Sequence, residues 1–572
     1  MKIKGYEVNF TEEELDEILA DKTRSIELIS REFNGYKKLP IGDKKAIDHL
    51  QRAADIINEV ALEQDNPFNL SIKRELEKLA VNDKYAAKIL QFFNCLNGVA
   101  GNNGIDREPV QIFKELPLLK GKNFYPTDLS EEEFHEIILR MAERGKIEEL
   151  KKILSARTMV RRNGDELKAI DYTEYFAPQF SEIANELEVA AYYCTEPEFK
   201  EFLSWQVQAL LQNNQDMDML ADKHWAVLQN NNLEFTISRE NYEDEMTGTV
   251  FNNPDIVKII NDNHIEAVAK DTLGGRVGLV NKEGTENILK FKHTLPYLAK
   301  WMPLSGKYKQ NSFSDADLKQ TMVDVDLITL TGDYAMCRGG ITQAQNLPNN
   351  DKIAVKCGGW RRNVYHRQVL LSYDVENEKK LLNRLVDAEL HKYVDHAQII
   401  TFDVGHENGH SLGPTAEYQN ALGVYKHIIE EHKANTFSIA SMAELSKKEG
   451  NFNKEDLKKI YASWVVETLF LRARPLFSEP HRMASLIEFN YLFENKVIWF
   501  DSNKKLHIDF ELIGMVAYRL LEETIKVQLS KSAESAKAFI DRWSVWGEWS
   551  RYIADVQQEL GVKPYIKIIT NF

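Results

Sequence analysis

The chain has 572 residues, with 72 lysines and arginines against 88 aspartates and glutamates and a formal net charge of −16. This length exceeds what one ordinary hydrophobic core supports, so two or more lobes are expected. The acidic balance disfavours binding to a phosphate backbone, and we expect no nucleic-acid partner.

The cysteines and the apolar stretches indicate the compartment. Cys95, Cys194, Cys337 and Cys357 are widely spaced and form no C-x-x-C motif, which is typical of a reducing compartment. The first residues lack the apolar core of a signal peptide. No window approaches the roughly 20 apolar residues that a membrane span needs. We therefore expect a cytoplasmic protein with no membrane partner, and its oligomeric state stays open.

The first part of the chain, residues 11–230, is expected to be mostly helical. Thr11 stands before three glutamates, the arrangement of an N-cap followed by an acidic first turn. Residues 131–156 repeat this texture, with apolar residues at helical spacing and charged residues between them.

The middle third changes to alternating apolar and polar residues, which is the pattern of half-buried strands. Strands are predicted at 233–238, 275–280, 323–330 and 352–356. Together they predict a small sheet. From about 365 to 550 the chain is predicted to be helical again.

This second helical part carries the motif His406-Glu407-Asn408-Gly409-His410, which fits the pattern H-E-x-x-H. Residues four apart share one face of a helix, so both imidazoles can reach one zinc ion. Glu407 lies beside them and could act as general base toward water activated by the metal. Against this interpretation, Asn-Gly is more often a turn, and Gly costs about 1 kcal/mol inside a helix.

A third zinc ligand is available at Glu430-Glu431. Residues 415–442 show helical spacing of apolar residues, and Gly413-Pro414 predicts a turn before them. A second helix would therefore return a carboxylate to the histidines. The alternative is a carboxylate pair on an exposed helix face.

These motifs give the chain a resemblance to the dipeptidyl peptidase III family of zinc peptidases. Residues 406–411 are similar to its H-E-x-x-G-H-G segment, one residue shorter, and 430–435 to its E-E-C-[RK]-A-[DE] segment. Weaker similarities follow in the order of the family: 240–242 to E-S-Y, 340–349 to G-I-N-I-P-N with an insertion, and 481–484 to H-M-x-A-R. The resemblance covers roughly residues 230–550.

The resemblance implies a role for each matching residue. The zinc ligands would be His406, His410 and Glu431, with Glu407 as general base and Glu430 supporting a ligating histidine. Tyr242 and His481 would stabilise the oxyanion. The α-ammonium group of the substrate would be held by Glu240, Asn346 and Asn349, and the C-terminal carboxylate of the peptide by Arg551.

The fold that the resemblance implies is α+β and mostly helical. It has two lobes separated by a wide cleft: an all-helical zinc lobe, and a lobe of helices with a small mixed sheet or barrel. We predict that residues 1–260, 328–385 and 546–572 form the sheet lobe. Residues 261–327 and 386–545 would form the zinc lobe.

The implied activity is that of a zinc exopeptidase. With one zinc per chain, the protein would release dipeptides from the free N-terminus of short peptides. The sequence departs from the family pattern in three places, so the resemblance supports metal binding more firmly than it supports substrate specificity. Two residues, and not three, separate the histidines; the connection to Glu431 is shorter; and Asn435 stands where the family has an acid.

Two alternatives stay open from the residues themselves. One is a zinc hydrolase of another bond, and the other is a peptide-binding protein without turnover. Imidazole and carboxylate ligands also suit divalent ions other than zinc. The sequence favours an enzyme, because a binding protein has no need of Glu407 between two histidines.

Overall fold

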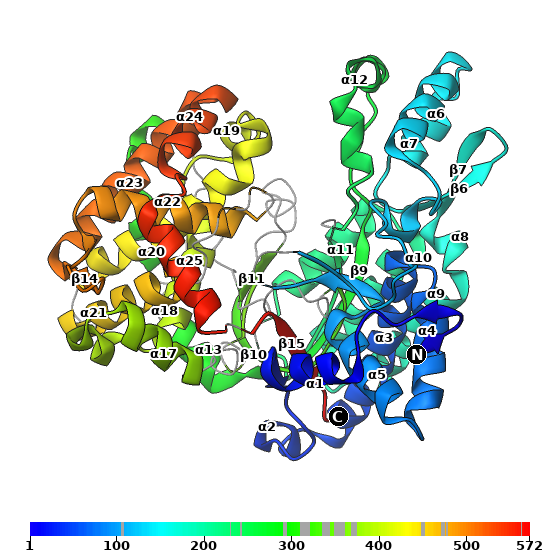
Figure 1. Cartoon of the computed structure of the whole chain (residues 1–572), viewed down its shortest axis with the longest axis horizontal. Coiled ribbons are helices and arrows are strands. Elements are labelled where there is room, and N and C mark those ends of the chain that lie inside the picture. The colour runs from blue at the N-terminus through cyan, green and yellow to red at the C-terminus, as the bar shows by residue number, and fades with distance from the viewer. Residues whose placement is uncertain are drawn as a thin grey trace.

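The computed structural model describes the chain except residues 105–107, 229, 241–242, 290–293, 309–320, 334–343, 348–360, 366, 368–374, 448–451, 471–474, 476, 478 and 562. Its helices form two bodies, with strands β9, β10 and β11 lying between them (Figure 1). The predicted α+β, mostly helical and two-lobed fold is therefore confirmed. The predicted cleft stays a prediction.

The N-terminal body is built from helices and short hairpins. Its elements are β1 (Lys2–Ile3), β2 (Tyr6–Glu7), α1 (Glu12–Asp21), β3 (Thr23–Glu27), α2 (Asn34–Lys37), α3 (Ile41–Asp65), α4 (Asn69–Ala80), α5 (Lys84–Leu96), β4 (Ala100–Asn102), β5 (Pro109–Gln111), η1 (Lys122–Phe124), α6 (Glu131–Glu143), α7 (Ile147–Ile153), β6 (Thr158–Asn163), β7 (Glu166–Asp171), α8 (Tyr172–Tyr175), α9 (Ala177–Tyr193), α10 (Pro197–Gln212), α11 (Gln215–Ala226), η2 (Thr247–Asn252) and α12 (Pro254–Asp262).

The core of this body forms around α3. Its apolar residues recur at helical spacing, and Leu50 and Ile57 are fully buried among the side chains of α9 and the sheet. The predicted helix start at Thr11 is confirmed: its side chain accepts from the Glu14 amide, and Glu14 accepts from the Thr11 amide.

The sheet has five described strands in the order β11-β12-β10-β9-β8. They are β8 (Leu233–Glu240), β9 (Thr272–Asn281), β10 (Thr321–Gly332), β11 (Ala344–Leu347) and β12 (Arg361–Val364). The β10–β12 pair is parallel and the other pairs are antiparallel, so the sheet is mixed, as predicted. Three predicted strands are confirmed in β8, β9 and β10; the fourth, 352–356, lies outside the described residues.

The C-terminal body consists almost entirely of helices. Its elements are α14 (Leu295–Trp301), η4 (Ser305–Lys307), α17 (Val375–Leu385), η6 (Ala388–Tyr393), α18 (Ala397–His410), α19 (Ala416–Asn420), η7 (Gly423–Tyr425), α20 (Lys426–Leu445), α21 (Lys454–Ser463), the π-helix η8 (Trp464–Phe470), α22 (Pro480–Glu494), the hairpin β13 (Ile498–Phe500) and β14 (Leu506–Ile508), α23 (Phe510–Ser530), α24 (Ala533–Trp543) and α25 (Glu548–Glu559). The short helix α13 (Lys282–Leu289) lies against β10.

Helix α20 is the centre of this body, because it packs against α18, α21, α22 and α23. Its residues from His432 to Met442 are buried on all sides, as expected for a core helix. The helix predicted over 415–442 is interrupted: α19 ends at Asn420 and α20 begins at Lys426. Between them lies the positive-φ residue Gly423.

The packing differs from the predicted lobe boundaries at β9, at the start of β10, at α17 and at α25. Strand β9 was assigned to the zinc lobe, but it pairs with β8 and β10 in the sheet. Helices α17 and α25 were assigned to the sheet lobe, but Leu385 and Ile553 are buried in the core of the C-terminal body. Strand pairing and packing between distant segments decide these boundaries, and neither is visible in local sequence patterns.

The last strand, β15 (Tyr565–Ile569), returns the chain to the N-terminal body. It pairs in parallel with β3, beside α1 (Figure 1). Cys95 and Cys194 are both buried. Within the described part of the chain, the helices are too short or too polar to cross a bilayer.

Candidate metal centre

The motif residues 406–410 form the last turns of α18, so Asn408-Gly409 continues the helix and does not form a turn. The turn comes afterwards, at Gly413, whose φ is +100°. This part of α18 is buried against α20. The two histidines therefore lie on one side of a regular helix, as the spacing predicts.

Two glycines allow α18 and α20 to approach closely. A Cβ on Gly409 would lie 2.9 Å from the Cα of Ala434, and a Cβ on Gly405 would overlap the Ser438 hydroxyl. The contact at Ala434 involves the backbone of α20, so a side chain at position 409 would push the whole helix away. Glycine destabilises a helix, but here it allows α18 and α20 to pack closely. This close packing brings Glu431 to the histidines and offsets the loss of helix stability.

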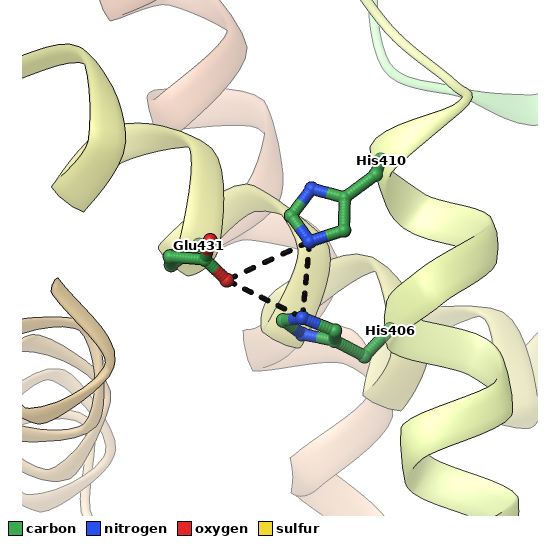
Figure 2. Close-up of side chains that lie close together, drawn as sticks. All are labelled: His406, His410 and Glu431. Atoms are coloured by element: carbon green, nitrogen blue, oxygen red, sulfur yellow. Dashed lines mark hydrogen bonds and ion pairs between the residues drawn. The ribbon is translucent and has the colours of Figure 1, made fainter. Parts of the chain in front are cut away.

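Three donor atoms converge between the two helices, as Figure 2 shows. The Nε2 atoms of His406 and His410 lie 3.1 Å apart. The Glu431 Oε2 atom lies 3.3 Å from the first and 3.6 Å from the second. Donors of a tetrahedral zinc site, each at about 2.05 Å from the ion, lie about 3.3 Å from one another. The triangle therefore has the size that zinc requires.

The hydrogen bonds of the two Nδ1 atoms determine which nitrogen of each ring carries the lone pair. The Nδ1 of His410 lies 3.1 Å from Glu430 Oε1, and the Nδ1 of His406 lies 2.7 Å from Asn435 Oδ1. Both oxygens accept, so both Nδ1 atoms carry the proton and both Nε2 atoms present a lone pair. Two lone pairs 3.1 Å apart repel unless a cation lies between them.

The electrostatics of the cluster also favour a cation. Burial lowers the pKa of His410, but the carboxylates of Glu431 and Glu430 outweigh burial and raise it to about 10. Burial alone would raise the pKa of Glu431, yet His481 and His410 hold it well below its usual range. The carboxylates thus stabilise a proton on the His410 imidazole. A metal ion bound to the histidines would take the place of this positive charge.

Glu430 is fixed by three further donors that the sequence did not indicate. Lys433 Nζ lies 2.7 Å from its Oε1, and the amides of Gln419 and Gln528 donate to its Oε2 over 2.8 and 3.2 Å. Lys433 is fully buried and also donates to the Leu412 carbonyl. Burial opposes ionisation of Glu430, but Lys433 and His410 lower its pKa below the usual value.

His481 lies beside this cluster, and Glu407 is next to His406 in the chain. His481 is in the first turn of α22, and its Nδ1 lies 3.3 Å from Glu431 Oε2. Its ring centroid lies 5.9 Å from that of His406. Glu407 follows His406 on α18 and is buried.

The predicted substrate residues come from the sheet. Glu240 ends β8, and Asn346 lies in β11, a strand that contacts α18. Only the backbone of Asn346 is described. Tyr242 and Asn349 lie outside the described residues. The sheet edge that carries Asn346 thus lies next to the helix that carries the histidines.

Arg551 lies exposed in the first turn of α25. The buried face of this helix packs in the core of the C-terminal body through Ile553 and Val556. No contact among the described residues joins Arg551 to the histidine pair, so its role stays a prediction.

Two buried side chains near His406 were not expected from the sequence. Glu488 of α22 and His432 of α20 are fully buried, and Asn435 connects Glu488 to His406. A polar residue inside an otherwise apolar helical stretch is the signal that could have indicated them. Nothing in the sequence shows that they meet.

No protein-family model matches the chain. The structure superposes on that of DPP III from Caldithrix abyssi with a TM-score of 0.78 and 23% identity, covering 97% of this chain and 98% of that one. It superposes on dipeptidyl-peptidase III from Corallococcus sp. strain EGB with a TM-score of 0.76 and 18% identity, covering 98% and 97%. The chain therefore has the dipeptidyl peptidase III fold, and the predicted resemblance is confirmed in the fold.

One curated sequence is similar over a long segment. A protein named Nudix hydrolase 3 from Arabidopsis thaliana is 24% identical over 486 residues, which are 80% of this chain and 58% of that protein. The chain thus spans less than two thirds of this relative. The activity in its name is therefore not transferred to this chain.

Proposed function

We propose that the protein is a zinc-dependent exopeptidase that resembles dipeptidyl peptidase III and removes dipeptides from the free N-terminus of short peptides. The observation that carries the proposal is the convergence of His406 Nε2, His410 Nε2 and Glu431 Oε2, with Glu407 between the two histidines in the chain. The fold shared with two dipeptidyl peptidase III structures supports it.

A zinc ion bound by these three donors would supply a Lewis acid for the scissile carbonyl and for water. Glu407 would take a proton from water and pass it to the leaving amine. His481, beside Glu431, would donate a hydrogen bond where negative charge develops, together with Tyr242. The buried outer partners hold the histidines in position, which limits the reorganisation that the reaction requires.

The substrate would lie along the sheet edge at β11. An extended peptide can add to such an edge by backbone hydrogen bonds. The α-ammonium would bind the carboxylate of Glu240 and the amide oxygens of Asn346 and Asn349. The distance from this group to the metal would select the second peptide bond. Arg551 would bind the far carboxylate.

Glu407→Gln tests the chemistry. We expect the variant to bind zinc like the wild type and to lose at least a hundredfold in kcat, because general base catalysis contributes about 10²–10⁴-fold. The exposed Glu417 of α19, paired with Lys531, provides the matched control Glu417→Gln, which should keep full activity. Turnover that survives in zinc-loaded Glu407→Gln would refute the assignment of the base.

N-terminal acetylation of the substrate tests the exopeptidase. Mass spectrometry of the products should show dipeptides from the free peptide and no cleavage of the acetylated one. Equal cleavage of both would indicate an endopeptidase. A panel of ester and phosphate substrates covers a hydrolase of another bond, and a peptide that binds but stays intact would indicate a binding protein.

A further inference from the structure

The two zinc-ligand histidines differ in what lies behind them. His410 contacts the carboxylate of Glu430 directly, whereas His406 contacts the neutral amide of Asn435. Behind this amide lies a second, fully buried carboxylate: Asn435 Nδ2 donates to Glu488 Oε1 over 3.1 Å. The outer partner of His406 thus consists of two residues in series, one from α20 and one from α22.

Glu488 determines which way the amide of Asn435 faces. Its Oε1 atom also lies 3.0 Å from the Nδ1 of the buried His432, so this oxygen accepts from two donors. A carboxylate oxygen accepts and cannot donate, so the Asn435 atom that faces it is the amide nitrogen. An inverted amide would place the Asn435 oxygen against Glu488 Oε1, and two acceptors at this distance repel.

The orientation of the amide in turn determines the tautomer of His406. With Oδ1 facing the ring at 2.7 Å, Nδ1 must carry the proton, and Nε2 keeps the lone pair that faces Glu431 and His410. An inverted amide would donate to Nδ1 and move the proton to Nε2. A ring with a proton on Nε2 cannot bind an ion there.

We propose that Glu488 is a positioning residue for the metal: by orienting Asn435 it selects the His406 tautomer whose Nε2 can bind zinc. The inference rests on the zinc site of the proposed function but not on peptide hydrolysis. Outer-sphere partners of this kind contribute about 10–100-fold to metal affinity. An acid at position 435 would need no such orientation, because both of its oxygens accept.

Zinc affinity of four proteins, measured by competition with a chelating dye, tests this inference. Glu488→Met removes the acceptor, and we expect affinity to fall about 10-fold or more. Asn435→Asp/Glu488→Met places a carboxylate directly on His406, and affinity should return to within about threefold of the wild type. The matched control is Glu467→Met, another buried glutamate of the same body, which should bind zinc like the wild type.

The rescue separates positioning from general structural damage. A double variant as weak as Glu488→Met, or Glu488→Met with wild-type affinity, would overturn the proposal. Circular dichroism and melting of the metal-free proteins verify the fold. Should Glu488→Met fail to fold, the double variant is compared with Asn435→Ala/Glu488→Met, which lacks both acceptors. Equal affinity of these two would also overturn it.

The test of peptidase activity and the test of the Glu488 role can fail independently of one another. Wild-type protein that binds zinc but cleaves no peptide would refute the peptidase and leave the positioning role of Glu488 intact. The opposite result, active peptidase with unchanged affinity in Glu488→Met, would refute only the positioning role.

Discussion

Helix α18 carries a cluster of histidine and glutamate at each end. At its C-terminal end His406 and His410 meet Glu431, and at its N-cap His396 meets Glu378 and Glu467. Both clusters combine imidazole and carboxylate within a small space. They differ in how the rings are held.

In the first cluster each ring gives its Nδ1 proton to an outer partner, so the two Nε2 lone pairs point to one place. In the second, one ring lies between two carboxylates. His396 Nε2 contacts Glu378, and His396 Nδ1 lies 2.5 Å from Glu467. The two clusters thus differ in arrangement: in the first, two rings bring one nitrogen each to a common point, and in the second, a single ring faces a different carboxylate with each nitrogen.

The strongest test of this comparison removes one histidine from each cluster. His410→Ala should abolish stoichiometric zinc in elemental analysis, because it removes one of three protein ligands. His396→Ala should keep one zinc per chain. It should instead cost roughly 3 kcal/mol of stability, because it leaves a buried Glu467 without its partner. Zinc lost from His396→Ala, with the fold intact by circular dichroism, would make the second cluster a metal site as well.

A smaller effect is expected from Gly409→Ala. Its Cβ would press on the backbone of α20 at Ala434, so we expect a loss of about 2 kcal/mol together with weaker zinc binding. Thermal melting and dye competition measure the two effects. Gly248→Ala is the matched control, since its Cβ would meet nothing within 4 Å. Wild-type affinity in Gly409→Ala would show that the close approach of α18 and α20 does not set the metal geometry.

The smallest effect concerns the pH dependence of stability. Burial lowers the pKa of His396, but Glu378 and Glu467 outweigh it and raise it from 6.5 to about 10. Burial raises the pKa of Glu467 from 4.5 to about 8. Because His396 and Glu467 act on one another, they behave as one pair that holds its protons more tightly when folded, so the folded state binds more protons than the unfolded state between about pH 5 and 10. Stability therefore falls as pH rises through this window.

Glu467→Gln should flatten this slope. We expect the wild type to lose on the order of 2 kcal/mol between pH 6 and pH 9 in urea titrations, and the variant to lose less than half of that. Glu389→Gln, an exposed glutamate of η6, should behave as the wild type. Parallel slopes in all three proteins would place the pH dependence outside this cluster.

The sequence predicted the parts of the site that depend on local spacing. His406, His410 and Glu431 were found because helix periodicity and a turn at Gly413 determine how they meet. The break between α19 and α20 was missed, since the apolar spacing continues across it. The Asn-Gly pair suggested a turn, because the tight contact of Gly409 with Ala434 is a property of the packed helices.

The remainder depends on contacts between distant segments. Glu488 lies 53 positions from Asn435, and no local pattern indicates which face of α22 turns toward α20. The place of β9 in the sheet has the same cause, because it joins the sheet through β8 and β10. The helices and three of the strands could be predicted because the residue pattern of each lies within one continuous segment of the chain.

The parallel pairing of β15 with β3 has a consequence for biosynthesis. Asn571, just after β15, bonds to Glu27 across 544 positions of the chain. On the ribosome, β3 is made early and must wait without its partner strand while both helical bodies are synthesised. Closure of this pair is a step of very high contact order, so it cannot occur before β15 has been synthesised. Until then β3 lacks the strand with which it pairs in the folded protein, and an unpaired strand edge is open to pairing with other chains.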